Sequence, residues 1–180
     1  LKMKKKHSFW TDFGKDNYAG VTYNNWRSKR LGVLYQGWMS NWQYANVVPT
    51  LKWRSAMTLP RELSLYLSQD SIYRIRSKDI THFKESFIKK VEKEKISLNK
   101  TTILLNKDEL DLTKAKIELE INNMEEVKYT FVASNINGDF LAFGYDHKEK
   151  KFFIDRSNSG VVDFSENFAL KPTIAPRFRK

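Results

Sequence analysis

Hydrophobic and polar residues follow different patterns in the two halves of the 180-residue chain. The first part contains short runs of aromatic and β-branched residues separated by turn signals, which is typical of β-strands. The runs that we expect to form strands are 18–23, 31–38, 56–67 and 71–76. The mostly apolar run 31–38 predicts a strand buried on both faces, and Pro60 favours a bulge or a sheet edge within 56–67. Four short strands with tight connections predict one antiparallel sheet, the unit of a β-propeller blade.

Between residues 78 and 95 the hydrophobic period lengthens. Apolar residues recur every three or four positions, at Ile80, Phe83, Phe87 and Val91. This spacing predicts one amphipathic helix, and Ser77 or Asp79 can cap its start. We expect this helix to link two β regions.

After residue 95 the period returns to two. In 115–122, Ile and Leu alternate with Lys and Glu, which predicts a strand with one solvated face. We expect further strands at 103–106, 128–135, 139–145 and 151–156, and a hairpin turn at 146–150. This region predicts half-buried antiparallel sheet, most simply one layer of a β-sandwich.

Tryptophan is confined to one part of the chain. All five Trp lie within the first 53 residues, whereas the last 110 residues contain most of the Lys–Glu alternation. This shift agrees with the change of period and places a boundary near residue 77. The sequence therefore predicts a blade domain over 1–77, a helical linker over 78–95 and a partial β-sandwich domain over 96–180.

Several classes of function are disfavoured by composition. The chain has no Cys and three scattered His, so it offers no thiolate site and little for a metal. No P-loop, GxGxxG or GxSxG motif occurs, and we expect no cofactor. No apolar run is long enough to span a membrane. Asp12 and Asp16 are four apart around Gly14, which favours hydrogen-bonding loop carboxylates over a catalytic pair.

The net charge of +11 raises the possibility of a polyanion ligand. Outside the Lys2–Lys6 cluster, however, basic residues are dispersed among acidic ones, as on an ordinary solvated surface. Nucleic-acid binding requires spatial clustering of basic side chains. We therefore expect neither a nucleic-acid nor a membrane partner.

The segment 37–46 combines aromatic residues with amides directly after an apolar run. Sugars present apolar C–H faces together with hydroxyl groups, and an indole with neighbouring amides matches both features. Trp38 lies inside the apolar run, which favours a core position. Trp42 lies among Ser, Asn and Gln, which favours contact with a ligand.

Four consecutive segments carry a resemblance to a known family: DFGKDNYA (12–19), GWMSNWQY (37–44), VPT (48–50) and WRSAMTLPREL (53–63). They resemble motifs of glycoside hydrolase family 32, whose levanases, inulinases and invertases cleave β-fructosidic bonds. The later segment FFIDRSNSG (152–160) is similar to a strand and turn of that family's β-sandwich. The resemblance covers nearly the whole chain, more closely before residue 67 than after it.

The resemblance implies a mainly β fold, in which a five-bladed propeller is followed by an antiparallel β-sandwich. It also implies retaining hydrolysis by an Asp nucleophile and a Glu acid. Trp42 matches a Trp that lines the sugar pocket, Asn41 and Gln43 lie in the same motif, and Asp16 matches a motif that shapes the funnel wall. These four residues are our candidates for substrate binding, with fructan or sucrose as the expected substrate.

The family's catalytic motifs are missing from these 180 residues. Neither Trp-Met-Asn-Asp-Pro-Asn-Gly nor Arg-Asp-Pro occurs, and without Cys there is no Glu-Cys motif. Retaining hydrolysis needs two carboxylates about 5 Å apart, so we expect no catalytic residue here. The chain then represents the last propeller blade and part of an incomplete sandwich, inactive alone, and partnered by the rest of the propeller or another copy of itself. A carbohydrate-binding module and, less favoured, a polyanion-binding protein are the alternatives.

Overall fold

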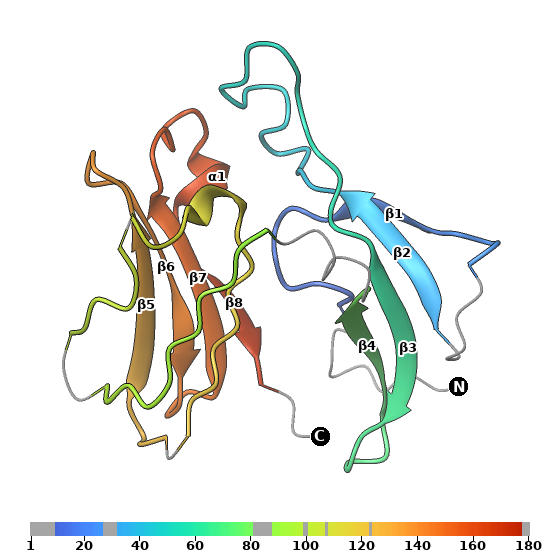
Figure 1. The fold of residues 1–180 in the computed structure, drawn as a ribbon. Helices are drawn as coiled ribbons and strands as arrows, with labels where there is room; N and C mark the ends of the chain where they lie inside the picture. The colour runs from blue at the N-terminus through green and yellow to red at the C-terminus, as the bar shows by residue number, and fades with distance from the viewer. Residues whose placement is uncertain are drawn as a thin grey trace. The chain divides into compact units, whose positions relative to one another are not determined.

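The fold is mainly β. A computed structural model of the chain describes residues 10–26, 32–80, 88–98, 101–106, 108–122 and 124–177. The chain forms two compact units, one comprising Leu1–Ile80 with Met124–Lys180 and the other Thr81–Asn123. The first unit contains two four-stranded antiparallel sheets (Figure 1). No helix in the described ranges is long and apolar enough to cross a membrane.

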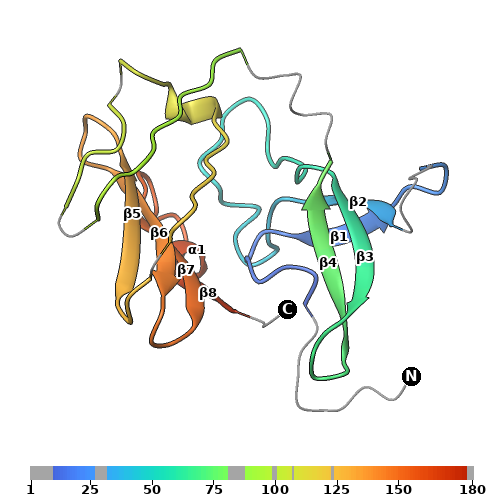
Figure 2. The ribbon, with the colours of Figure 1, turned by 60° about the horizontal axis from the view of Figure 1, so that its bottom comes forward.

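The first sheet has its strands in sequence order, β1-β2-β3-β4 (Figure 2). These strands are β1 (Tyr18–Thr22), β2 (Val33–Trp38), β3 (Arg61–Leu67) and β4 (Tyr73–Asp79). The four predicted strands are therefore confirmed, with one difference. The expected long strand 56–67 is interrupted, since Met57 forms only an isolated bridge with Trp38 and β3 begins at Arg61. Pro60 has no backbone N–H to donate to a ladder, which explains the break.

The expectation that 31–38 is buried on both faces is wrong for the described part of that run. Val33 is 47% exposed, and within β2 only Gly37 is fully buried. The run lies centrally in its sheet, but the described residues do not fully cover both faces of that sheet. An apolar run therefore identified the strand and not its degree of burial.

The second sheet is more regular and contains β5 (Lys128–Ser134), β6 (Phe140–Asp146), β7 (Lys151–Asn158) and β8 (Thr173–Pro176). β5 pairs with β6 along its full length, which confirms the strands expected at 128–135 and 139–145. β6 and β7 form the predicted hairpin through the turn at 147–150. Aromatic side chains meet across these strands: Phe131 stacks on Phe143 with ring centroids 5.8 Å apart. Such cross-strand pairs stabilise a sheet.

A short helix, α1 (Glu166–Ala169), lies between β7 and β8. Ser165 caps its start, because the side-chain oxygen accepts a hydrogen bond from the backbone N–H of Asn167. α1 contacts β7 and places Phe168 near the first sheet's β2–β3 connection.

The second unit contradicts two expected strands. The described residues of 103–106 and 115–122 form no strand, and the regular element there is a 3₁₀ helix at Leu112–Lys114. A strand needs a neighbour for its backbone groups, and alternation alone does not supply one. The alternating charges instead pair along the chain, as between Lys116 Nζ and a Glu118 carboxylate oxygen at 3.0 Å.

The expected linker helix over 78–95 is not confirmed. Residues 81–87 of this range lie outside the described residues, and 88–95 have no helical assignment. Residues 78 and 79 belong to β4, where Asp79 pairs with Arg61 and Lys78 with Glu62. Ladder hydrogen bonds thus take the backbone groups at the predicted helix start.

Candidate functional site

The connection between β2 and β3 carries three of the four candidate residues. Its first part is a turn over 42–47 that Asn41 organises. The Asn41 side-chain oxygen accepts from the Gln43 backbone N–H at 2.9 Å, and its backbone oxygen accepts from Ala45 N–H at 2.8 Å. The Asn41 amide nitrogen donates to the Lys15 backbone oxygen at 3.0 Å. Asn41 therefore acts as an Asx-type turn former, and its side chain is largely occupied by the protein.

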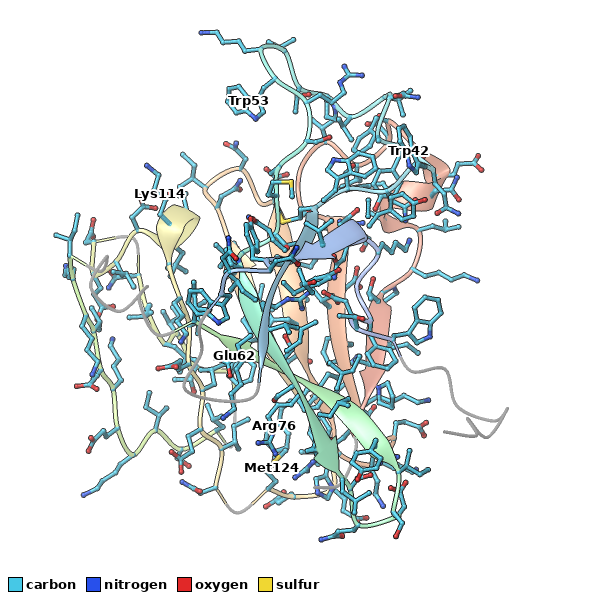
Figure 3. All side chains as sticks on the ribbon, turned by 90° about the vertical axis from the view of Figure 1, so that its right-hand side faces the viewer. Trp42, Trp53, Glu62, Arg76, Lys114 and Met124 are labelled. Atoms are coloured by element: carbon cyan, nitrogen blue, oxygen red, sulfur yellow. The ribbon has the colours of Figure 1, made fainter. Side chains whose placement is uncertain are left out.

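Trp42 projects from this turn toward solvent. Its side chain lies beyond the strand ends (Figure 3), and the residue is 64% exposed. The Trp42 and Trp38 rings meet edge-on with centroids 5.0 Å apart, and Trp38 lies 6.3 Å from Tyr18. Trp38 is half-buried, while Gln43 beside Trp42 is exposed. The turn thus presents an indole supported by a second indole and flanked by an amide, which is suited to stacking on a sugar ring.

Asp16, the fourth candidate, lies before β1 and is hydrogen-bonded to two side chains of the protein. Its Oδ2 accepts a hydrogen bond from Arg156 Nη1 at 2.6 Å, and its Oδ1 accepts one from the Tyr44 hydroxyl. The Asp16 side chain is 21% exposed. Each carboxylate oxygen thus accepts one hydrogen bond from the protein, and these contacts hold Asp16 in place.

Tyr44 connects Asp16 to the turn. It is 3% exposed and lies two positions after Trp42. Its ring packs edge-on against Phe168 at 5.4 Å, and Arg156 Nη2 donates to its hydroxyl oxygen at 3.0 Å. Burial, followed by the hydrogen bond to Asp16, raises the pKa of Tyr44 to about 12. Tyr44 is therefore protonated at neutral pH and donates its hydroxyl proton.

Arg156 completes this cluster from the second sheet. Its guanidinium carbon lies 3.9 Å from the centre of the Phe168 ring, and its Nε donates to the Phe168 backbone oxygen at 3.1 Å. We call Asp16, Tyr44, Arg156 and Phe168 the Tyr44 anchor. It joins β7 and α1 to the turn that carries Trp42.

A second network holds the segment that precedes β1. Asp12 accepts from the Gly14 backbone N–H at 2.8 Å and pairs with Arg61 Nη1 at 3.1 Å. Asn17 donates to Asp12 at 3.3 Å and accepts from the Tyr35 hydroxyl at 2.9 Å. Asp12 and Asp16 thus enter separate ion pairs, as expected for loop carboxylates rather than a catalytic pair.

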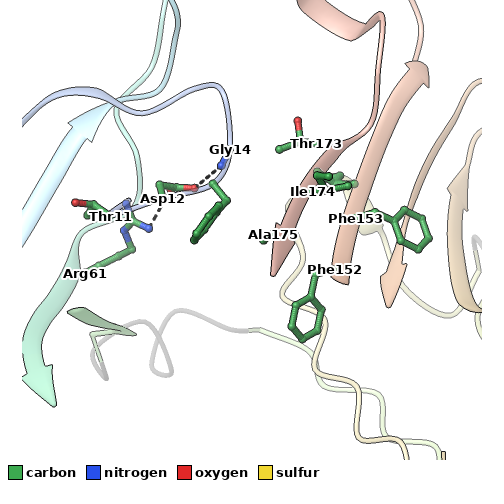
Figure 4. Close-up of a pocket in the computed structure, with 11 residues that line it drawn as sticks. Thr11, Asp12, Gly14, Arg61, Phe152, Phe153, Thr173, Ile174 and Ala175 are labelled. Atoms are coloured by element: carbon green, nitrogen blue, oxygen red, sulfur yellow. Dashed lines mark hydrogen bonds and ion pairs between the residues drawn. The ribbon is translucent and has the colours of Figure 1, made fainter. Parts of the chain in front are cut away.

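A pocket of about 450 Å³ lies beside this second network. Figure 4 shows Asp12 and Arg61 on one side of it and β8 residues such as Ile174 on the other. The lining combines the Arg61–Asp12 ion pair with apolar residues of β7 and β8. None of the four candidate residues lines it, so the sequence-predicted site is a different surface.

Side chains that commonly bind metals are not clustered in the ranges that the structure describes. These ranges contain no group of three or more His, Asp or Glu side chains arranged to hold a metal ion. His147 lies within these ranges, and His7 and His82 lie outside them.

Sequence reasoning did not single out Tyr44, Arg156 and Phe168. Tyr44 and Arg156 belong to segments that carry the family resemblance, but they are 112 positions apart and no local pattern pairs them. Their contact follows from the packing of one sheet's loop against the other sheet's helix.

Comparison with known proteins decides the family. Residues 2–78, which include β1 to β3 and all but the last residue of β4, match the family model described as the glycosyl hydrolases family 32 N-terminal domain. The levanase of Bacillus subtilis (strain 168) is 33% identical over 169 residues, covering 93% of this chain and 25% of the levanase. The chain belongs to glycoside hydrolase family 32.

Further members of family 32 agree in sequence and fold. The extracellular exo-inulinase of Meyerozyma guilliermondii is 32% identical over 168 residues, which is 89% of this chain and 32% of that enzyme. The crystal structure of exo-inulinase from Aspergillus awamori superposes with a TM-score of 0.60 at 22% identity, covering 93% of this chain and 32% of the inulinase. The chain thus shares this fold and spans a quarter to a third of these relatives' length.

Proposed function

We propose that these 180 residues form part of a β-fructosidase that hydrolyses levan, inulin or sucrose by a retaining mechanism. The sheet β1–β4 is then the last propeller blade, and residues 96–180 belong to the β-sandwich. The nucleophile and the acid come from other parts of the enzyme, because the family's catalytic motifs do not occur in this sequence. Family membership and the names of the levanase and inulinase relatives support the substrate class.

The exposed Trp42 is the observation that carries the proposed role of this segment. Its indole lies edge-on against Trp38 beside the exposed Gln43. A fixed aromatic face gains from stacking on the apolar C–H surface of a fructosyl unit, while an amide can bond the hydroxyl groups. Trp42 therefore supplies one wall of the sugar pocket.

Binding of the 180-residue chain to levan tests this role. We expect Trp42→Ala to weaken retention on immobilised levan about tenfold, the loss of one stacking contact. Trp53→Ala is the matched control, because Trp53 is 71% exposed and lies on another part of the same connection (Figure 3). Equal retention of the wild type and Trp42→Ala would overturn the role of Trp42.

Hydrolysis provides the second test. Without two carboxylates across the scissile bond, neither covalent nor acid catalysis is available. Incubation of the chain with levan, inulin or sucrose should therefore release no fructose. Release that follows first-order dependence on the concentration of this chain would show that these residues contain a catalytic pair.

Carbohydrate binding without hydrolysis is the second candidate function. The solvent exposure of Trp42 favours it, because an open aromatic platform can bind a polysaccharide surface. A pocket wall should bind weakly until the other walls are present, whereas a binding module reaches its full affinity alone. Calorimetric titration with levan oligosaccharides separates the two by the affinity of the 180-residue chain.

A further inference from the structure

We propose that Arg156 is a positioning residue that fixes the sugar-binding turn through Tyr44. This inference rests on the proposed role of Trp42 and adds that the second sheet determines where Trp42 is held. Arg156 lies in β7, and its guanidinium reaches the first sheet's loops at two points, Asp16 and Tyr44.

The guanidinium uses each of its three nitrogens for a different partner. Nη1 donates to Asp16, Nη2 to the Tyr44 hydroxyl and Nε to the Phe168 backbone oxygen. Its face also covers the Phe168 ring. Three hydrogen bonds from one planar guanidinium fix its orientation, and a lysine ammonium cannot reproduce this geometry.

The restraint passes to Trp42 over a short length of backbone. Tyr44 is two residues from Trp42 and is almost fully buried, whereas Trp42 is exposed. The Tyr44 backbone N–H donates to the Asn41 oxygen at 3.1 Å, and its backbone oxygen accepts from Val47 N–H at 3.0 Å. Tyr44 therefore fixes the turn from inside while Trp42 faces outward. Pre-organising a binding group in this way lowers the entropy lost when a ligand binds.

Lys15 adds a parallel contact between the same regions. Its Nζ donates to the Asn167 backbone oxygen of α1 at 2.8 Å, and its own backbone oxygen accepts from Asn41. The start of the turn and its buried centre are thus both connected to α1. This arrangement makes the position of Trp42 dependent on the second sheet.

The chain contains a matched pair for comparison. Arg177 Nη1 donates to the Tyr145 hydroxyl at 3.2 Å, and the Arg177 guanidinium lies over the Tyr145 ring at 5.4 Å. Tyr145 is buried like Tyr44. Tyr145 lies in β6 and Arg177 directly follows β8, and this pair makes no hydrogen bond to the described residues of the Trp42 turn.

The test reads the Trp42 side chain directly, without sugar. The 180-residue chain is labelled with 5-fluorotryptophan, and the ¹⁹F resonance of Trp42 is assigned by its loss in Trp42→Phe. We expect this resonance to shift or broaden in Arg156→Met and Tyr44→Phe, and to change less in Arg156→Lys, which retains the charge. Arg177→Met and Tyr145→Phe should leave it unchanged.

A Trp42 resonance that is unchanged in folded Arg156→Met, or that moves equally in the Arg177 and Tyr145 controls, overturns the proposal. Tyr44→Phe keeps the ring and removes one oxygen atom, so it carries the test if Arg156→Met fails to fold. Unfolding of Tyr44→Phe as well would show that the cluster maintains the fold rather than positioning Trp42, and would also overturn it.

Levan affinity is measured on the same variants. We expect a several-fold loss in Tyr44→Phe relative to Tyr145→Phe. If Trp42→Ala leaves levan affinity unchanged, the proposed function fails, while the ¹⁹F spectra still decide whether Arg156 positions Trp42. The two failures are therefore distinguishable.

Discussion

The two sheets have the same strand number and order but differ in regularity. In the first sheet, β2 and β3 pair over only three residues, and a long connection with the exposed Trp42 separates them. In the second sheet, β5, β6 and β7 pair over most of their length and are joined by short turns. The first sheet therefore presents the candidate binding surface, and the second provides a regular support.

This difference agrees with the proposed role of the β2–β3 connection. A long connection can place a side chain beyond the strand ends, but its backbone needs restraints that a ladder does not give. The Tyr44 anchor provides these restraints from β7 and α1. The proposed binding loop on one sheet is thus held by side chains from the other.

The largest expected change in stability that distinguishes the two sheets is at a glycine of the second sheet. A Cβ at Gly144 would lie 1.9 Å from the Tyr129 backbone oxygen on the neighbouring strand. The backbone of β5 cannot move away from Gly144 without disturbing the hydrogen bonds between β5 and β6. We therefore expect Gly144→Ala to lower the free energy of unfolding by about 3 kcal/mol. Urea denaturation, monitored by near-ultraviolet circular dichroism, measures this free energy.

Gly37 of the first sheet is the matched control. A Cβ there would meet the Asn17 side-chain oxygen at 2.1 Å, and a side chain can rotate away. We expect Gly37→Ala to cost about 1 kcal/mol. Equal urea midpoints for the two variants would contradict this expected difference between the two sheets.

An intermediate effect is expected for Tyr44→Phe. Loss of the hydroxyl removes hydrogen bonds to Asp16 and Arg156 and should cost about 1 kcal/mol at neutral pH. The pKa of Tyr44 is raised from 10.0 to about 12 in the folded chain. The folded state therefore holds this proton more tightly than the unfolded state, and its contribution to stability is complete below pH 10 and is lost between pH 10 and 12.

The pH dependence separates this contribution from those of other groups. Between pH 10 and 12, the stability of the wild type should fall more steeply than that of Tyr44→Phe, as measured by urea midpoints at each pH. Tyr145→Phe serves as the control. Parallel pH profiles for the wild type and Tyr44→Phe would show that the Tyr44 hydroxyl does not have this raised pKa.

The smallest effect is expected at the start of α1. Ser165→Ala removes the side-chain oxygen that accepts from Asn167 N–H, which should cost about 0.5 kcal/mol. Ser165→Asp retains a capping oxygen and should recover the stability. Thermal denaturation of the three chains measures the difference, and a Ser165→Asp variant no more stable than Ser165→Ala would argue against the cap.

Much of the fold followed from local patterns. Alternation and turn signals predicted the strands at 18–23, 128–135, 139–145 and 151–156, because a strand's two faces repeat every second residue. The same alternation at 115–122 gave a wrong prediction. An alternating pattern shows that the side chains suit a strand. A strand also needs a neighbouring strand to hydrogen-bond with its backbone, which the pattern does not supply.

The candidate site was likewise predictable only in part from the sequence. The amides and indoles of 41–43 were evident in the sequence because they are adjacent. Asp16 was also selected, but its partners Arg156 and Tyr44 were not. No property of Asp16 itself contains that information.

The sequence by itself determined the family motifs, most strands and the aromatic turn, since each depends on residues close together along the chain. The tertiary structure decided that Arg156 meets Tyr44 and Asp16, and therefore that the second sheet holds the turn of the first. The physical reason is that periodicity fixes local backbone geometry and which side faces solvent. Pairing between residues more than a hundred positions apart depends on how whole sheets pack.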